Sequence, residues 1–199
     1  MEPGLDRACS RDNEDDFPLG PRRTAQDIAR RCIILCCVAA SPQFPPGNFS
    51  EWLRREGLWG EVSPKEIEIL TSSELTERQG IDSSWRSEAL QALLWSIEKL
   101  DSLPPYTELV KVSRMLDVMP DPGSSTTAFI SSARLRSDEV IDAEFEKTVS
   151  AHWQIRNERD HPDQKREPMI DGVVVERHWA FAWLVNYDNE PWDQVPLTT

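Results

Sequence analysis

The sequence has few basic residues for its length. Its 199 residues include 22 Lys and Arg against 35 Asp and Glu, which gives a formal net charge of −13 at pH 7. Because affinity for nucleic acids comes largely from cations that neutralise phosphates, this balance argues against a protein that binds DNA or RNA. The densest basic cluster is Arg22, Arg23, Arg30 and Arg31, and three of these are tied to one predicted helix start and are not spread over a face. We therefore expect a basic protein partner or none.

Long apolar runs are also absent. The longest, residues 32–40, has nine residues, whereas about 20 are needed to cross a bilayer. The first residues lack a basic segment followed by an apolar one, the pattern of a signal peptide. We therefore expect no membrane association and a cytoplasmic location.

Cysteine is scarce, and its four positions form no CxxC pair: Cys9, Cys32, Cys36 and Cys37. The last three lie inside the apolar run, where reduced thiols act as small core side chains. A redox or metal-binding role is the alternative.

Motifs of the common catalytic classes are missing as well. The sequence holds no GxSxG, HExxH, GxxxxGK[ST] or GxGxxG. Residues 96–99 match SxxK, but they lie near the end of a predicted helix and have no partner motif. No two of the three histidines are three or four residues apart, the spacing of metal ligands on one helix face: His152, His161 and His178. Histidines that are hydrogen-bonded in the core are therefore favoured over a metal site. We expect no metal and no cofactor.

What the chain does contain is a series of helix signals. Thr24 with Asp27, and Ser63 with Pro64 and Glu66, are N-terminal capping patterns. Proline-rich breaks separate the apolar periodic segments. The pattern predicts a mainly α fold, a single-domain bundle of about seven helices with little or no sheet: 24–40, 50–56, 64–71, 83–100, 107–118, 138–158 and 173–187. The serious strand candidates are 128–130 and 172–175. Residues 1–21 are acidic and rich in proline, and we expect them to form a disordered arm before a single helical domain at 22–199.

Two of these helices predict where the core lies. The helix at 138–158 carries large apolar residues at strict i, i+4 spacing, which predicts a core stripe: Ile141, Phe145, Val149 and Trp153. The helix at 173–187 is apolar on nearly all sides, so it should be the most buried.

Three consecutive polar residues interrupt that apolar helix: Glu176, Arg177 and His178. Burying an unpaired charge is costly, so each should find a partner elsewhere. We expect a buried polar network, and Glu176→Ala should cost about 3–5 kcal/mol because it strands a buried cation. The network is either a catalytic cleft or a set of ion pairs that fixes helix register. Its candidates are Arg86, Glu88, Arg134, Arg136, Glu139, Asp142, Glu176, Arg177 and His178.

Four blocks of the sequence, taken in order, resemble a bacterial family known as domain of unknown function 4272: WRSEALQALLW at 85–95, LRSDEVID at 135–142, VVVERHWAFAWL at 173–184 and WDQV at 192–195. The resemblance covers roughly residues 22–199. It implies a predominantly helical, single-domain protein and carries no assigned activity. Family members tend to end in an acidic tail, and this chain has Gln194 and Thr198 where acids are usual.

Three functions follow as hypotheses. The first is a non-catalytic interaction protein, of the immunity type that neutralises a basic toxin domain, because opposite charge steers association. Its candidate binding residues lie at the start of the helix at 138–158 and in the tail: Asp138, Glu144, Glu146, Asp188, Glu190, Trp192 and Asp193. The second is a small hydrolase that uses Glu88, Glu176 and His178 with an arginine. The third is a scaffold with no dedicated partner.

Overall fold

The computed structural model describes residues 20–44, 47–161, 163 and 165–197. These residues form eight α-helices and no β-strand, so the mainly α prediction is confirmed, with one more α-helix than expected. The α-helices are α1 (Ala25–Ala40), α2 (Asn48–Arg55), α3 (Pro64–Thr71), α4 (Glu77–Ser96), α5 (Val112–Leu116), α6 (Thr127–Ser131), α7 (Asp138–Asp160) and α8 (Asp171–Leu184). Three short 3-10 helices accompany them: η1 (Ser41–Gln43), η2 (Trp59–Glu61) and η3 (Trp192–Gln194). The predicted N-terminal arm lies outside the described residues except for Gly20 and Pro21.

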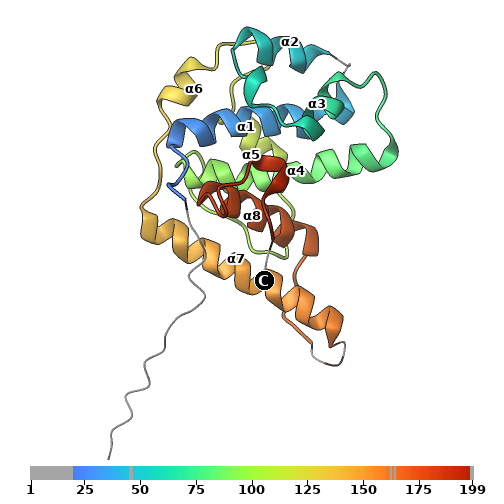
Figure 1. Ribbon diagram of the computed structural model, residues 1–199, viewed down its shortest axis with the longest axis vertical. Coiled ribbons are helices and arrows are strands. Elements are labelled where there is room, and N and C mark those ends of the chain that lie inside the picture. Colours follow the sequence, from blue (N-terminus) through green and yellow to red (C-terminus); the bar gives the residue numbers. More distant parts are fainter. Residues whose placement is uncertain (1–19, 45–46, 162, 164, 198–199) are drawn as a thin grey trace, which may run out of the picture.

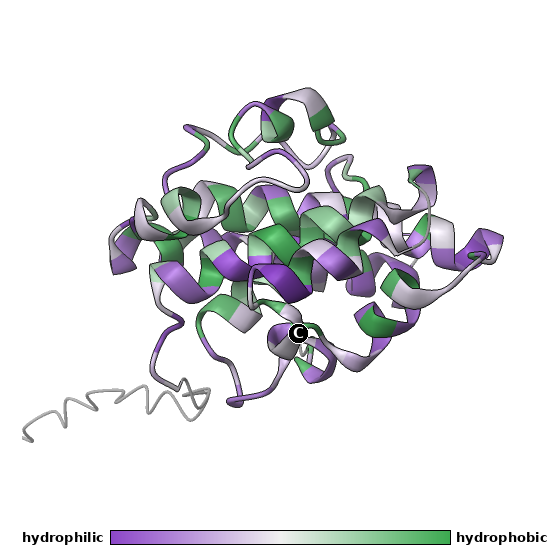
Figure 2. Cartoon of the chain, turned by 90° about the horizontal axis from the view of Figure 1, so that it is seen from above, coloured by the Kyte–Doolittle hydropathy of each residue, from purple (hydrophilic) through white to green (hydrophobic). Residues whose placement is uncertain are grey.

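The helices stack in a simple order. Helix α1 packs on α4, α4 on α8, and α8 on α7. Figure 1 shows α2, α3 and α6 on one side of this stack and α7 at its opposite edge. Hydrophobic residues gather along the helices in the middle of the molecule, where they form one main core (Figure 2).

The starts of the helices follow the capping chemistry. Thr24 and Ser63 both head capping boxes, as predicted. The predicted start of α4 was wrong: the helix begins at Glu77, not at residue 83. Thr76 and Gln79 form a capping box there, and the helix then runs through Gly80.

The end of α4 and the length of α5 also differ from the prediction, because tertiary hydrogen bonds override local preference. Arg136 donates to the carbonyls of Trp95 and Leu100, at 2.7 and 2.8 Å, and so caps the end of α4. The predicted helix at 107–118 is reduced to α5. Before it, the Val110 amide donates to the Glu88 carboxylate at 2.7 Å.

Both strand candidates are helical. Residues 128–130 belong to α6, and residues 172–175 belong to α8. Helix α8 buries ten of its fourteen residues, more of its length than any other helix, so the prediction for it is confirmed. It ends beside Asn186, which adopts a positive φ of 59°, a conformation that Asn tolerates better than most residues.

The predicted core stripe of α7 was wrong at its far end. Ile141 is buried, but Trp153 is 53% exposed. Each i, i+4 step overshoots one helical turn by about 40°, so three steps rotate Trp153 by about 120° away from Ile141. The face that packs on α8 continues instead through Thr148, His152 and Ile155, which are buried.

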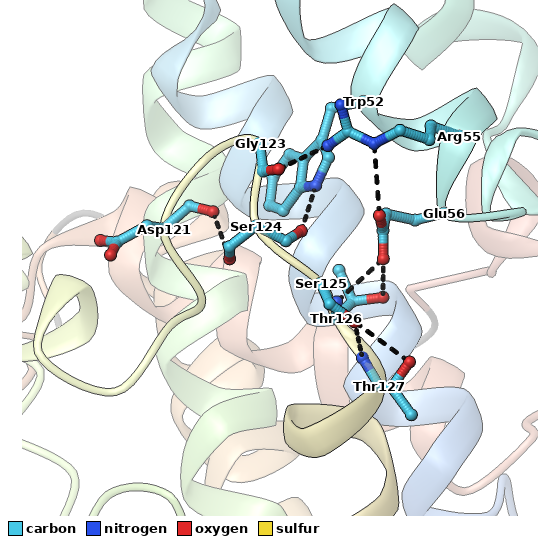
Figure 3. Close-up of polar contacts among 9 residues, drawn as sticks. All are labelled: Trp52, Arg55, Glu56, Asp121, Gly123, Ser124, Ser125, Thr126 and Thr127. Atoms are coloured by element: carbon cyan, nitrogen blue, oxygen red, sulfur yellow. Dashed lines mark hydrogen bonds and ion pairs between the residues drawn. The ribbon is translucent and has the colours of Figure 1, made fainter.

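The segment that leads into α6 is held against α2 by hydrogen bonds (Figure 3). The Trp52 indole donates to the Ser124 carbonyl at 2.7 Å. Glu56 accepts from the Thr126 amide at 2.9 Å and from its hydroxyl at 3.1 Å. The amide of Thr126 is the main reason that the pKa of Glu56 is lowered. The segment is therefore tied to α2 through an ionised carboxylate.

Contact between α4 and α8 depends on Gly172. A Cβ at this position would lie 2.6 Å from the Trp85 ring. Gly172→Ala should therefore destabilise the protein by about 1–3 kcal/mol, although alanine favours a helix by about 1 kcal/mol. Urea unfolding measures the change.

Gly60→Ala is the matched control, because a Cβ there meets nothing within 4 Å. It should change the free energy of unfolding by less than about 0.5 kcal/mol. A Gly172→Ala variant as stable as the parent would show that the Trp85 ring swings away freely.

Candidate functional site

The polar residues of α8 meet α4 in two adjacent ion pairs. The Arg86 guanidinium lies 3.0 Å from both oxygens of Glu176, which is buried. The same guanidinium stacks over the Trp179 ring, 4.7 Å from its centroid. Glu176 is thus held by one cation at the edge of the core.

The second pair is deeper. Arg177 and Glu88 are each 1% exposed, and a nitrogen of Arg177 lies 3.6 Å from a Glu88 oxygen. Arg177 also donates to the Pro104 carbonyl at 2.7 Å and lies over the Tyr106 ring. Tyr106 therefore covers one face of this cation, and Pro104 and Glu88 contact its edges.

Burial dominates the electrostatics of these groups. Loss of water raises the pKa of Glu88 and of Glu176 and lowers the pKa of Arg177, in each case as the largest cause. Attraction between the partners opposes this effect without overcoming it. Such pairs add little net stability, but the removal of one partner is costly.

His178 extends the polar core towards α7. Its Nδ1 lies 2.7 Å from Nδ1 of His152, so one ring donates and the other accepts. Burial, and then the neighbouring His152, lower the pKa of His178 to about 4. Burial likewise lowers the pKa of His152. The pair is therefore neutral at pH 7.

The remaining network candidates lie elsewhere. Arg134 is exposed, and Arg136 caps α4 through carbonyl groups. Glu139 is exposed on α7, and Asp142 pairs with Arg22. Arg134 and Arg136 precede α7, and Glu139 and Asp142 lie in its first two turns.

The tail candidates are divided between surface and core. Trp192 is 3% exposed and stacks edge-on against Trp183, so it anchors the tail and does not present its ring to a partner. Asp193 accepts from the Ser63 hydroxyl and the Lys65 amide, at 2.8 and 3.0 Å, and so caps α3. Asp188 is exposed and Glu190 is half-buried.

The long helix offers the more open surface. Asp138 pairs with Arg22, and Glu144 with Lys147, whereas Glu146 is exposed. One stripe of α7 is exposed throughout and is called here the outer face: Glu139, Ala143, Glu146, Ser150 and Trp153. The i, i+4 spacing along α7 predicted Trp153 in the core, but it lies at the surface. Alternation of three- and four-residue steps along the helix is the signal that would have placed it there.

The thiols and carboxylates form no further site in the described residues. Cys32, Cys36 and Cys37 are free, and burial raises the pKa of Cys36 to about 11. Within the described ranges, no group of three or more His, Cys, Asp or Glu side chains is placed to hold a metal ion. None of the described helices is both long and apolar enough to span a membrane.

The fold and the site together define an all-α protein with a polar core between α4, α7 and α8 and an acidic outer helix. Residues 15–195 match the model of the family described as Domain of unknown function (DUF4272). The chain belongs to this family. No curated protein and no solved structure matches it.

Removal of the Glu88 charge tests the polar core. Arg86 keeps 22% of its side chain exposed, whereas Arg177 has almost no contact with water. Glu88→Gln, rather than Glu176→Ala, is therefore the change that strands a buried cation. It should cost about 3–5 kcal/mol in urea unfolding.

Asp82→Asn is the control, because the side chains of its pair with Arg78 are 50% and 84% exposed. It should cost less than about 1 kcal/mol. Equal losses for the two variants would show that Pro104 and Tyr106, not Glu88, hold Arg177.

The histidine pair predicts a dependence of stability on pH. The pKa of His178 is about 4 in the folded protein against an ordinary 6.5, so the folded state binds fewer protons in this range. The contribution of neutral His178 to the free energy of unfolding is fully present above pH 6.5. It is lost as the pH falls towards 4, by roughly 3 kcal/mol in total. His178→Asn keeps a hydrogen-bonding side chain without this titration, so its free energy of unfolding should fall less over that range.

His161→Asn is the matched control, because His161 is exposed. Its stability should follow the parent protein across the whole range. If the parent and His178→Asn show parallel curves between pH 6.5 and 4, the assignment to this pair is wrong.

Proposed function

We propose that this protein is a non-catalytic interaction protein of the bacterial cytoplasm, of the immunity type that neutralises a basic partner such as a toxin domain. The outer face of α7 carries the proposal. It presents Trp153, 53% exposed, two helical turns from Glu146. Tryptophan is one of the residue types enriched at binding hot spots, and acidic groups steer a cationic partner.

The net negative charge of the whole chain also favours a basic partner. A formal charge of −13 raises the local concentration of a basic protein at low salt. Helix α7 has 23 residues, about 35 Å in length, which is long enough to cross a standard interface. The free thiols of Cys32, Cys36 and Cys37 fit a reducing compartment.

The hydrolase alternative has less support. Glu88 and His178 are buried, and Glu176 is occupied by Arg86. A catalytic acid or base must reach the proton that it transfers, and a substrate could reach only Glu176. A scaffold without a partner gives no reason for a large exposed indole on the outer face.

Capture from host extract tests the proposal. The tagged protein should retain a basic protein at about 50 mM salt and release it at about 500 mM, because screening weakens charge steering. Once that partner is purified, Glu139→Lys with Glu146→Lys should slow association at low salt about tenfold. Trp153→Ala should raise the dissociation rate at least tenfold.

The control pair is Glu51→Lys with Glu74→Lys, exposed positions in α2 and between α3 and α4 that make the same change in net charge. It should affect association much less than the α7 pair. Retention of the partner by all variants, or no basic partner at any salt concentration, would contradict the proposal. Hydrolysis of a small substrate that Glu176→Gln abolishes would favour the enzyme.

A further inference from the structure

A groove of about 440 Å³ lies between α3, α4, α8 and η3, away from the outer face of α7. Trp85 and Trp179 line it, and Glu176, Asp82 and Glu66 contribute carboxylates. Glu68 and Asp193 bring the carboxylates of the lining to five, against three bases, Lys65, Arg78 and Arg86. The lining is therefore acidic and aromatic.

Two buried oxygens of the lining lack hydrogen-bond partners among the described residues. One is the hydroxyl of Ser83, which is 3% exposed. The other is Oε1 of Glu66, whose Oε2 accepts from Arg31 at 2.7 Å and from the Ser63 amide at 2.9 Å. Buried polar atoms are normally paired, so each of these oxygens keeps an unused acceptor position among the described residues.

The walls already hold cations of one kind. Arg86 stacks on Trp179 and pairs with Glu176. Behind Glu66, Arg31 lies over the Trp192 ring, 5.2 Å from its centroid. Each guanidinium is thus placed between an indole and a carboxylate. Half-buried Trp85 carries no such cation among the described residues, and its ring rests on Gly172.

We propose that this groove binds a guanidinium group on an aliphatic stem. The planar cation donates to Oε1 of Glu66 and to the Ser83 hydroxyl, and the stem packs on Trp85. Guanidinium suits the site better than ammonium, because it stacks on aromatic rings and offers several donors in one plane. The ligand is a small guanidine or an arginine side chain of a peptide. The lining of the groove contains no residue of α7.

Butylguanidinium, butylammonium and N-acetyl-arginine methylamide are the probes, titrated against the full chain by calorimetry. Butylguanidinium should bind with a Kd on the order of 1 mM and at least tenfold more tightly than butylammonium. A further tenfold gain for the arginine derivative would identify a peptide as the source, and a loss would identify a small guanidine. In NMR spectra, the indole N–H signals of Trp85 and Trp179 should shift, whereas that of Trp153 should not.

Ser83→Ala separates a binding role from a structural one. Removal of a buried hydroxyl without a partner should raise the Tm of the free protein, yet it should weaken binding of butylguanidinium about fivefold. Ser84→Ala is the control, because Ser84 is exposed and donates to the Ile81 carbonyl; it should leave binding unchanged. Equal affinity for butylguanidinium and butylammonium, unchanged affinity in Ser83→Ala, or no binding at 50 mM probe would each overturn the proposal.

Discussion

Arg177 lies in the centre of the protein, and the need to surround its charge constrains the elements around it. The cation is 1% exposed, and its partners come from α4, through Glu88, and from the segment that follows α4, through Pro104 and Tyr106. Because an unpaired buried charge is strongly destabilising, these contacts permit one register of α8 against α4. The Arg86–Glu176 pair and the contact of Gly172 with Trp85 lie along the same interface and require that register.

Arginine has a consistent use in this acidic protein. Arg31, Arg86, Arg136 and Arg177 each lie over an aromatic ring, respectively Trp192, Trp179, Trp95 and Tyr106. Each also binds a carboxylate or a carbonyl group in the interior. These basic residues hold helices together, and many acidic residues remain at the surface. The interior therefore pairs arginines with carboxylates and carbonyl groups, whereas α7 presents acids to solvent.

Local rules predicted much of the fold, and their failures have physical causes. The capping boxes at Thr24 and Ser63 depend on residues within one turn, and both were predicted. The position of Trp153 depends on the drift of an i, i+4 pattern around α7, which a simple count of spacing overlooks. The shortened α5 depends on a hydrogen bond to Glu88, which lies 22 residues earlier in the chain. No window of local sequence contains that partner.

The sequence by itself determined the fold class, the apolar character of α8 and the requirement that Glu176, Arg177 and His178 have partners, because composition, periodicity and the cost of buried charge are properties of the residues alone. Only the tertiary structure decided which partners they have. Arg86 and Arg136 are the same residue type, yet the crossing of α4 and α8 brings one to Glu176, while the segment before α7 places the other on the carbonyl end of α4. Tertiary packing likewise buries Trp192 and leaves Trp153 exposed. The surface available to a side chain depends on what the rest of the chain packs against it, and residue type does not specify that.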